Sequence, residues 1–185
     1  MNMNRREALK SVVLMMGGTM VGATAILTGC SPEKQIEGLN FSPDDITFLD
    51  ELGDTIIPET DTPGAKAAGI GAFMVMMVKD TYDAEQQQTF VDGLNKIRSE
   101  FKASKGVDFV EASAEDRLAY LNGSYEEYKT SQNREPQVIN MLRDLTVLGY
   151  FTSEIGATQA LNYVEVPGRY DGCIDLKPGD RAYAI

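Results

Sequence analysis

Histidine is absent from this chain, and cysteine occurs at only two positions, Cys30 and Cys173. Without imidazole there are no Ser-His or Cys-His nucleophile pairs, none of the usual histidine ligands of zinc, copper or haem, and no Cys-x-x-Cys-His site for covalent haem. Little of the standard hydrolytic and redox chemistry of proteins remains. The sequence therefore points away from an enzyme with reactive side chains of its own.

Positive charge is also scarce, and it becomes scarcer after residue 29. The whole chain of 185 residues has a formal net charge of −11. Residues 1–29 contain three basic residues and one acidic residue, so 14 basic and 27 acidic residues follow them, with a net charge of −13. Such a surface repels phosphate backbones and anionic membranes. We expect no nucleic-acid partner, and binding through shape or through a complementary protein face.

No charge occurs from Ser11 to Pro32, and this run follows a short basic start that contains Arg5 and Arg6. A basic start, an apolar centre and a small-residue exit site are typical of a secretory signal, and the adjacent arginines indicate the twin-arginine route. The sequence Leu27-Thr28-Gly29-Cys30 resembles a bacterial lipobox, in which the cysteine after the cut is acylated. We therefore expect a mature protein that begins at Cys30 and is lipid-anchored on the periplasmic side of a bacterial membrane.

A transmembrane anchor is the alternative interpretation of the uncharged run, which is long enough to cross a bilayer at about 20 residues. Glycines and threonines dilute its hydrophobicity, which suits a cleavable segment better than a permanent span. These residues are Gly17, Gly18, Thr19, Gly22, Thr24, Thr28 and Gly29. We predict a signal over residues 1–29 and a polar tether over residues 30–40, followed by a domain over residues 41–185.

Acylation of Cys30 would leave Cys173 as the only thiol, so no internal disulfide could form in an oxidising compartment. Cys173 would then be either buried in the domain or paired with a cysteine outside it. Because free cysteines behave as small hydrophobes, burial is the expectation.

After residue 40, apolar residues recur every three or four positions, which predicts helices. Ser42 with Asp45, and Ser113 with Asp116, form capping boxes that mark two helix starts, and Asp83 caps a third. Pro58 ends the first helix, and the Lys105-Gly106 pair ends the long helix that Asp83 caps. The residues expected to face inward are Ile46, Leu49, Leu52 and Ile56; Phe73, Met76 and Met77; Phe90, Leu94, Ile97 and Phe101; Leu118, Leu121, Tyr125 and Tyr128; and Val138, Met141, Leu142, Leu145 and Leu148.

Two further helices complete the expected fold. One covers Ala72 to Tyr82, and another opens at Pro136 and continues to Ser153, after which a short helix can cover Ile155 to Leu161. No strand pattern persists beyond Tyr163 to Val166, and turn formers fill the tail. The sequence thus predicts an all-α, single compact domain of about five or six helices with an irregular C-terminal arm.

Three patterns that could carry chemistry have simpler explanations. Gly69-Ile70-Gly71 lacks the preceding strand and the third glycine of a nucleotide loop, so it predicts a helix start. Consecutive methionines such as Met76 and Met77 cannot face one metal site on a helix, so core packing is favoured. Paired carboxylates lie at helix starts or on polar faces, where capping and solvation explain them. We predict no catalytic, cofactor-binding or metal-binding residue in this chain.

The segment from Gly149 to Tyr163 differs from the acidic remainder of the chain. It concentrates aromatic, small and neutral hydrogen-bonding residues. Aromatic and arginine enrichment with few acids is typical of a protein-binding patch, and a locally packed C-terminal arm is the alternative. The candidate partner-binding residues are Tyr150, Phe151, Glu154, Tyr163, Arg169 and Tyr170.

Two blocks of sequence carry a family resemblance. Residues 54–69 contain an Ile-Ile-Pro and a Thr-Pro-Gly-Ala element, and residues 150–158 contain Thr-Ser-Glu-Ile-Gly-Ala. Together with Tyr163 and the tail at residues 166–173, these blocks resemble the gluconate 2-dehydrogenase small (third) subunit family. The resemblance covers essentially the whole mature domain, and the twin-arginine leader fits it.

The resemblance implies a non-catalytic partner of a flavin-dependent sugar or polyol dehydrogenase of the glucose-methanol-choline type. FAD would belong to that large subunit, and some complexes of this kind also have a multihaem cytochrome c subunit as electron acceptor. The flavin subunit of such complexes lacks its own signal and is exported folded with the small subunit through the twin-arginine translocase. The family offers no catalytic residues to transfer, and the lipobox at Cys30 departs from members released as soluble periplasmic subunits.

Two other functions stay open at this point. One is an independent enzyme that uses a carboxylate base such as Glu154 beside Arg169. The other is a stand-alone periplasmic ligand-binding or structural lipoprotein without an enzyme partner.

Overall fold

The computed structural model describes residues 39–130 and 137–166, and in the tail residues 168, 172, 173, 175 and 177–184. The chain divides into two units, Met1–Gln35 and Ile36–Ile185, and every described residue belongs to the second. The predicted signal, Cys30, most of the tether and Pro136 lie outside the described residues. Within the described part of the chain, no helix has the length and apolar character needed to cross a membrane.

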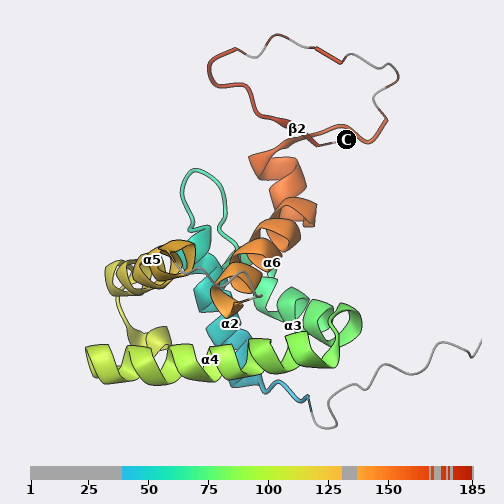
Figure 1. The fold of residues 1–185 in the computed structure, drawn as a ribbon. Coiled ribbons are helices and arrows are strands. Elements are labelled where there is room, and N and C mark those ends of the chain that lie inside the picture. The colour runs from blue at the N-terminus through green and yellow to red at the C-terminus, as the bar shows by residue number, and fades with distance from the viewer. Residues whose placement is uncertain are drawn as a thin grey trace, which may run out of the picture. The chain divides into compact units, whose positions relative to one another are not determined.

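The described residues form the predicted helical domain (Figure 1). The described residues contain five α-helices and three short helical turns. The turn η1 (Lys66–Ala68) lies between the first two α-helices, η2 (Phe109–Glu111) lies between the third and the fourth, and the π-helical turn η3 (Gly156–Ala160) follows the last one. The α-helices are α2 (Pro43–Ile56), α3 (Ile70–Thr81), α4 (Ala84–Lys105), α5 (Ala114–Thr130) and α6 (Val138–Thr152). The all-α fold class is therefore confirmed.

The helices begin where their capping residues predict. At α2, the Ser42 amide donates to the Asp45 carboxylate at 2.8 Å and the Asp45 amide donates to the Ser42 hydroxyl at 3.2 Å. Asp83 and Gln86 form the corresponding box at α4. Gly106, with a φ of 76°, ends α4 in the left-handed conformation that glycine adopts without strain. Local sequence signals thus set the limits of these helices.

The core contains the predicted stripe of α4, since Phe90, Leu94, Ile97 and Phe101 are all buried. Phe101 meets the rings of Phe109 and Tyr120 edge to face, with centroids 4.9 and 5.3 Å apart. Helix α6 packs against α2, α3, α4 and α5. It is therefore the central element of the domain, and in Figure 1 it leads from the other helices to the C-terminal tail.

Three residues that were predicted to face the core are exposed instead. Met76, Leu118 and Leu148 have exposed fractions of 50%, 47% and 46%. In each case the buried face of the helix lies to one side of the predicted one. In α3 the buried stripe is Ile70, Met74 and Val78, which recur every four residues. In α6, Gly149 faces α3 and lets the Phe73 ring approach, because a Cβ at this glycine would lie 2.5 Å from the ring. Leu148 is therefore turned outward.

Candidate partner-binding surface

Tyr150 joins the end of α6 to the loop after α2. Its side chain is buried, with an exposed fraction of 2%, and its hydroxyl donates to the Pro63 carbonyl at 2.6 Å. These residues belong to the two sequence blocks that carry the family resemblance. The blocks therefore meet in the folded domain, where they hold one structural junction together.

The loop side of this junction is compact. The Ala65 amide donates to the Ile57 carbonyl at 2.9 Å, which closes the loop on the last turn of α2. Gly64 is buried inside this loop, and a Cβ there would lie 2.6 Å from both an Asp54 carboxylate oxygen and the Glu59 amide. The Thr-Pro-Gly-Ala element thus needs its glycine because the surrounding backbone leaves no room for a side chain.

The helix side of the junction ends in a tight turn at Ser153. The Ser153 hydroxyl donates to the Tyr150 carbonyl at 2.7 Å and accepts a hydrogen bond from the Gly156 amide at 3.0 Å. Gly156 is buried, and a Cβ at this position would overlap the Tyr150 carbonyl oxygen. The Thr-Ser-Glu-Ile-Gly-Ala block therefore stops α6 and packs η3 directly onto its last turn.

Beyond η3 lies the segment that we call the arm, residues 162–184, of which residues 162–166, 168, 172, 173, 175 and 177–184 are described; its two ends pair with each other. The two-residue strands β1 (Asn162–Tyr163) and β2 (Tyr183–Ala184) pair in parallel, and the Asn162 amide donates to the Ala182 carbonyl at 2.8 Å. Of the arm residues whose exposure is described, only Val164 is partly covered and the rest are exposed. The arm thus has no core among its described residues. Its short strand pair was not predicted from the sequence.

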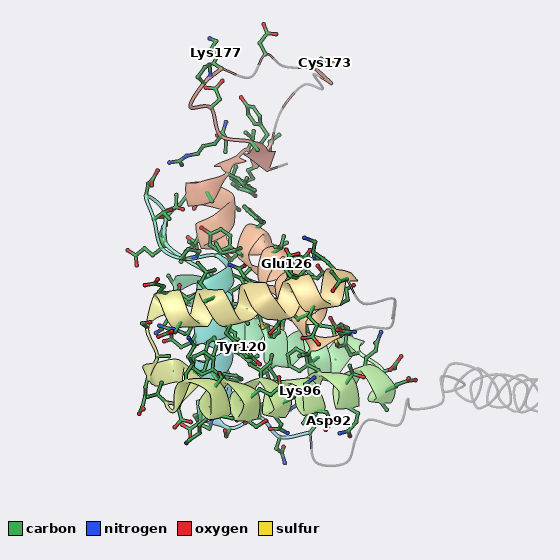
Figure 2. The ribbon with its side chains drawn as sticks, turned by 60° about the vertical axis from the view of Figure 1, so that its left-hand side comes forward. Asp92, Lys96, Tyr120, Glu126, Cys173 and Lys177 are labelled. Carbon is green, nitrogen blue, oxygen red and sulfur yellow. The ribbon has the colours of Figure 1, made fainter. Side chains whose placement is uncertain are left out.

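Cys173 is exposed, which contradicts the expectation of a buried thiol. It lies on the outer part of the arm, far from the helices, as does Lys177 (Figure 2). The expectation failed because burial of a small hydrophobe needs a core around it, and the described part of the arm supplies none.

The candidate partner-binding residues do not all lie on the surface. Phe151 and Tyr163 have exposed fractions of 40% and 52%, and Glu154 is also exposed. Tyr150 is buried, so it can only position the residues around it. Arg169 and Tyr170 lie outside the described residues.

Other apolar side chains extend this exposed region. Val147 and Leu148 are exposed on the same helix as Phe151, and Tyr183 is half exposed beside β1. Because Tyr183 pairs with Asn162, and Tyr163 with Ala184, the two tyrosines lie on opposite faces of the strand pair. We use the name α6–arm surface for the exposed residues Val147, Leu148, Phe151, Tyr163 and Tyr183, which therefore do not all share one face. Sequence analysis assigned Leu148 to the core and did not single out Val147 or Tyr183, although the apolar type of these residues is visible in the sequence.

A buried carboxylate in α2 is held by two cations from distant parts of the chain. Glu51 has an exposed fraction of 7%, and it forms ion pairs with Lys66 and Arg117. Burial alone would raise the pKa of Glu51, but the hydrogen bonds and charges of Lys66 and Arg117 outweigh it and lower the pKa. Conversely, the bond to Glu51 raises the pKa of Lys66. This cluster fixes α2, η1 and α5 to one another, and its fully engaged carboxylate serves the fold.

Two of the hollows on the described surface contain several polar side chains. One, of about 340 Å³, is lined mainly by polar residues of η3 and the arm, including Asn162 and Asp180. The other, of about 350 Å³, lies between α4, α5 and the start of α6. There, burial and then the nearby Glu100 carboxylate raise the pKa of Tyr120 to about 12, so its hydroxyl stays protonated at neutral pH. Neither hollow contains a nucleophile beside a general base.

No group of three or more cysteine, aspartate or glutamate side chains among the described residues is arranged to hold a metal ion. The described domain exposes apolar side chains at the end of α6 and in the arm that follows η3.

Comparison with known proteins gives one match. A family model described as gluconate 2-dehydrogenase subunit 3 matches residues 43–168. The matched range begins at the first residue of α2 and ends in the arm after β1, so it includes both sides of the Tyr150–Pro63 junction. No curated protein and no solved structure matches the chain.

Proposed function

Because the chain belongs to the gluconate 2-dehydrogenase subunit 3 family, we propose that it is a non-catalytic small subunit of a flavin-dependent sugar or polyol dehydrogenase. In this proposal it binds and stabilises the large subunit and carries that subunit through the twin-arginine pathway. FAD belongs to the large subunit, and a cytochrome c subunit can complete the complex. The acylated Cys30 holds the assembly on the periplasmic side of the membrane.

The observation that carries this proposal is the arm. Loops longer than about 12–15 residues without secondary structure are uncommon in compact domains unless they have a function. Ordering such a segment costs conformational entropy. In the helices, burial of side chains offsets this cost, but the described residues of the arm are exposed and gain little from burial. A partner that covers the arm would supply the missing burial.

The composition of the α6–arm surface supports a protein as that partner. Aromatic side chains are enriched at the centre of protein interfaces, and Phe151, Tyr163 and Tyr183 belong to this surface. The rest of the chain has a large excess of acidic residues and lacks histidine. A docking role uses the exposed aromatic residues that the domain presents.

Co-purification tests the binding role. The chain would be expressed with the dehydrogenase encoded beside it, and affinity purification under gentle conditions should recover a flavin-containing complex. Replacing Phe151 and Tyr163 together by alanine should lower recovery of the flavoprotein about tenfold or more, since anchor residues dominate interface energy. The control replaces Val110 and Leu118, which are exposed apolar residues of η2 and α5, and should leave recovery unchanged.

Failure to recover any flavoprotein with the unaltered chain would refute the accessory role. The alternative of a stand-alone periplasmic ligand-binding or structural lipoprotein would then be favoured. Turnover of sugars by the isolated chain with an artificial electron acceptor would instead favour an independent enzyme.

Substitution in the signal tests the export role. Changing Arg5 and Arg6 to lysine should leave both this chain and the large subunit in the cytoplasm, because the partner depends on the signal of this chain. Export of the large subunit under these conditions would refute co-export. Changing Cys30 to alanine should abolish acylation, and unchanged membrane fractionation would mean that the segment is an uncleaved span.

A further inference from the structure

Helix α3 has no polar side for most of its length. Its residues from Ile70 to Val78 contain no polar side chain, and Lys79 is its first charged residue. A helix on the surface of a globular protein usually has a polar outer side, whereas a helix that is apolar all round is usually buried. Ala72 and Met76 of α3 are nevertheless exposed. The exposed side of α3 therefore has the composition of a buried surface.

Helices α4 and α5 show that this composition is a local property of α3. On α4, Asp92, Lys96 and Glu100 are exposed, and on α5 Glu126 and Glu127 are exposed. Charged side chains such as these keep their hydration only where water reaches them. The outer sides of α4 and α5 are thus suited to water, and the outer side of α3 is suited to a covering surface.

Helix α6 packs beside α3 and runs in the opposite direction (Figure 1). A Cβ at Gly149, late in α6, would lie 2.5 Å from the Phe73 ring near the start of α3. At the other end of α3, burial and then the Asp144 carboxylate raise the pKa of Tyr82, so Asp144 lies close to this tyrosine. Exposed residues of the two helices can therefore form one surface.

Four exposed apolar residues form what we call the α3–α6 face: Ala72, Met76, Leu148 and Phe151. Met76 lies one turn after Phe73, and Leu148 directly precedes Gly149, so both flank the line along which the two helices touch. Ala72 and Phe151 continue the two rows at helical spacing. The centres of protein interfaces are depleted in charged residues and enriched in methionine and aromatic residues. The α3–α6 face has this composition.

The charges at the edge of the face indicate which kind of partner covers it. Three carboxylates and one cation lie three or four residues from members of the face, namely Asp80, Asp144, Glu154 and Lys79. Arg143 forms an ion pair with Asp144 at 2.7 Å, so an excess of negative charge remains at the edge. A second copy of this acidic chain, or an anionic lipid surface, would add more negative charge there. A protein surface with an apolar centre and a basic edge is complementary.

We propose that the large dehydrogenase subunit covers the α3–α6 face with an apolar surface that has lysine or arginine residues at its edge. The proposal rests on the proposed function, in which this subunit binds the exposed apolar residues of α6 and the arm. It adds α3 to the interface and states the charge of the opposing surface. Because Leu148 and Phe151 also belong to the α6–arm surface, the two regions are continuous.

Two leucines of nearly equal exposure provide a matched test. Leu148 in the face and Leu118 in α5 have exposed fractions of 46% and 47%. Each would be replaced by glutamate in the full chain, which would be expressed with the dehydrogenase encoded beside it. Leu148→Glu should lower recovery of the flavoprotein at least about tenfold, because the interface would bury an unpaired charge. Leu118→Glu should leave recovery unchanged.

The variant Met76→Glu decides whether α3 belongs to the interface. It should lower recovery by the same factor as Leu148→Glu, and circular dichroism should show that all three variants keep the helix content of the original chain. Full recovery with Met76→Glu would overturn the proposal. Because the unaltered chain would still co-purify, that result would leave the accessory role intact, whereas failure of the unaltered chain to recover a flavoprotein would refute both.

A labelling experiment avoids the introduction of charge. In a Cys173→Ser background, Ala72→Cys should react with N-ethylmaleimide at least about tenfold more slowly in the complex than in the chain alone, because the partner limits access to the thiol. Leu118→Cys is the control and should react at the same rate in both. Equal rates for Ala72→Cys would also overturn the proposal.

Charge reversal tests the basic edge of the partner. Asp80→Lys combined with Glu154→Lys should lower recovery about threefold, because like charges would then meet across the interface. Asp92→Lys combined with Glu126→Lys changes the net charge equally on α4 and α5 and should leave recovery unchanged. Unaltered recovery with the first pair would overturn the basic edge. A dimer of the isolated chain in analytical ultracentrifugation that Met76→Glu dissociates would assign the face to a second copy instead.

Discussion

The helices α2 to α6 and the arm differ in where their side chains lie. In the helices, rings pack edge to face around Phe101, and the buried carboxylate of Glu51 has two cationic partners. In the arm, the residues whose exposure is described are exposed, apart from the partly covered Val164. If the arm binds the partner as proposed, this difference separates stability from recognition in the chain. Substitutions in the helices should change unfolding, and substitutions in the arm should change partner binding.

The sharpest test of this difference compares two aromatic residues. Phe101→Ala should lower the free energy of unfolding by about 3–5 kcal/mol, because it removes a fully buried ring and leaves a cavity. Tyr183→Ala in the arm should change it by less than about 0.5 kcal/mol. Urea denaturation of the mature chain, followed by circular dichroism, measures both. A large loss of stability at Tyr183 would mean that the arm belongs to the core.

A charge substitution tests the same difference through pH. Glu51→Gln should destabilise the domain at pH 7 by about 3 kcal/mol, since it leaves Arg117 without its buried partner. Because Lys66 and Arg117 hold the pKa of Glu51 below its ordinary value of 4.5, the carboxylate stabilises the fold above that pH. This contribution is lost as the pH falls through the lowered pKa of the folded state.

The stability difference between the original chain and Glu51→Gln should therefore shrink below pH 4.5. Denaturation midpoints measured from neutral to acid pH would show the two curves converge. Glu165→Gln, at an exposed position in the arm, is the control and should follow the original chain at every pH. A stability difference between the original chain and Glu51→Gln that stays constant down to acid pH would refute the ion-pair explanation.

Two glycines test the boundary between the helices and the arm. Gly156→Ala should cost about 2 kcal/mol, because the new methyl group would overlap the Tyr150 carbonyl and push η3 away from α6. Gly123→Ala, on an open face of α5, should instead stabilise the domain by up to about 1 kcal/mol. Thermal unfolding measures both variants. Similar effects at the two positions would contradict the close packing of η3.

The smallest expected effect concerns the junction itself. Tyr150→Phe should lower the free energy of unfolding by about 1 kcal/mol, since the Pro63 carbonyl loses its hydrogen-bond donor. Partner recovery should fall as well if the junction positions the α6–arm surface. Tyr163→Phe removes an exposed hydroxyl and should leave stability unchanged. An unaltered stability in Tyr150→Phe would show that this hydrogen bond is weak.

Features set by neighbouring residues could be predicted from the sequence. The helix caps at Ser42, Asp83 and Ser113, and the stripe from Phe90 to Phe101, depend on residues three or four positions apart. The inward faces of α3, α5 and α6 were partly wrong, because their helical phase depends on which neighbour each helix meets. In α5, Leu121 is buried and Arg117 turns toward Glu51, which leaves Leu118 outside.

The candidate site depended more on distant contacts and was predicted less completely. The segment around Phe151 and Tyr163 was predicted to bind a partner; both side chains are exposed, and their binding role stays a prediction. The burial of Tyr150 was missed because its partner, Pro63, lies in another part of the sequence. The cluster of Glu51 with Lys66 and Arg117 left no local pattern, since its members are 15 and 66 residues apart.

The hydrogen bond from Tyr150 to Pro63 connects residues 87 positions apart. Closing so long a loop costs entropy before its contacts can form, so this bond belongs to the slow, non-local steps of folding. The base of the arm is then fixed only when both halves of the domain have come together, and an unfinished chain would lack the complete docking site proposed above. A companion that selects this site would therefore accept finished copies and leave defective ones behind.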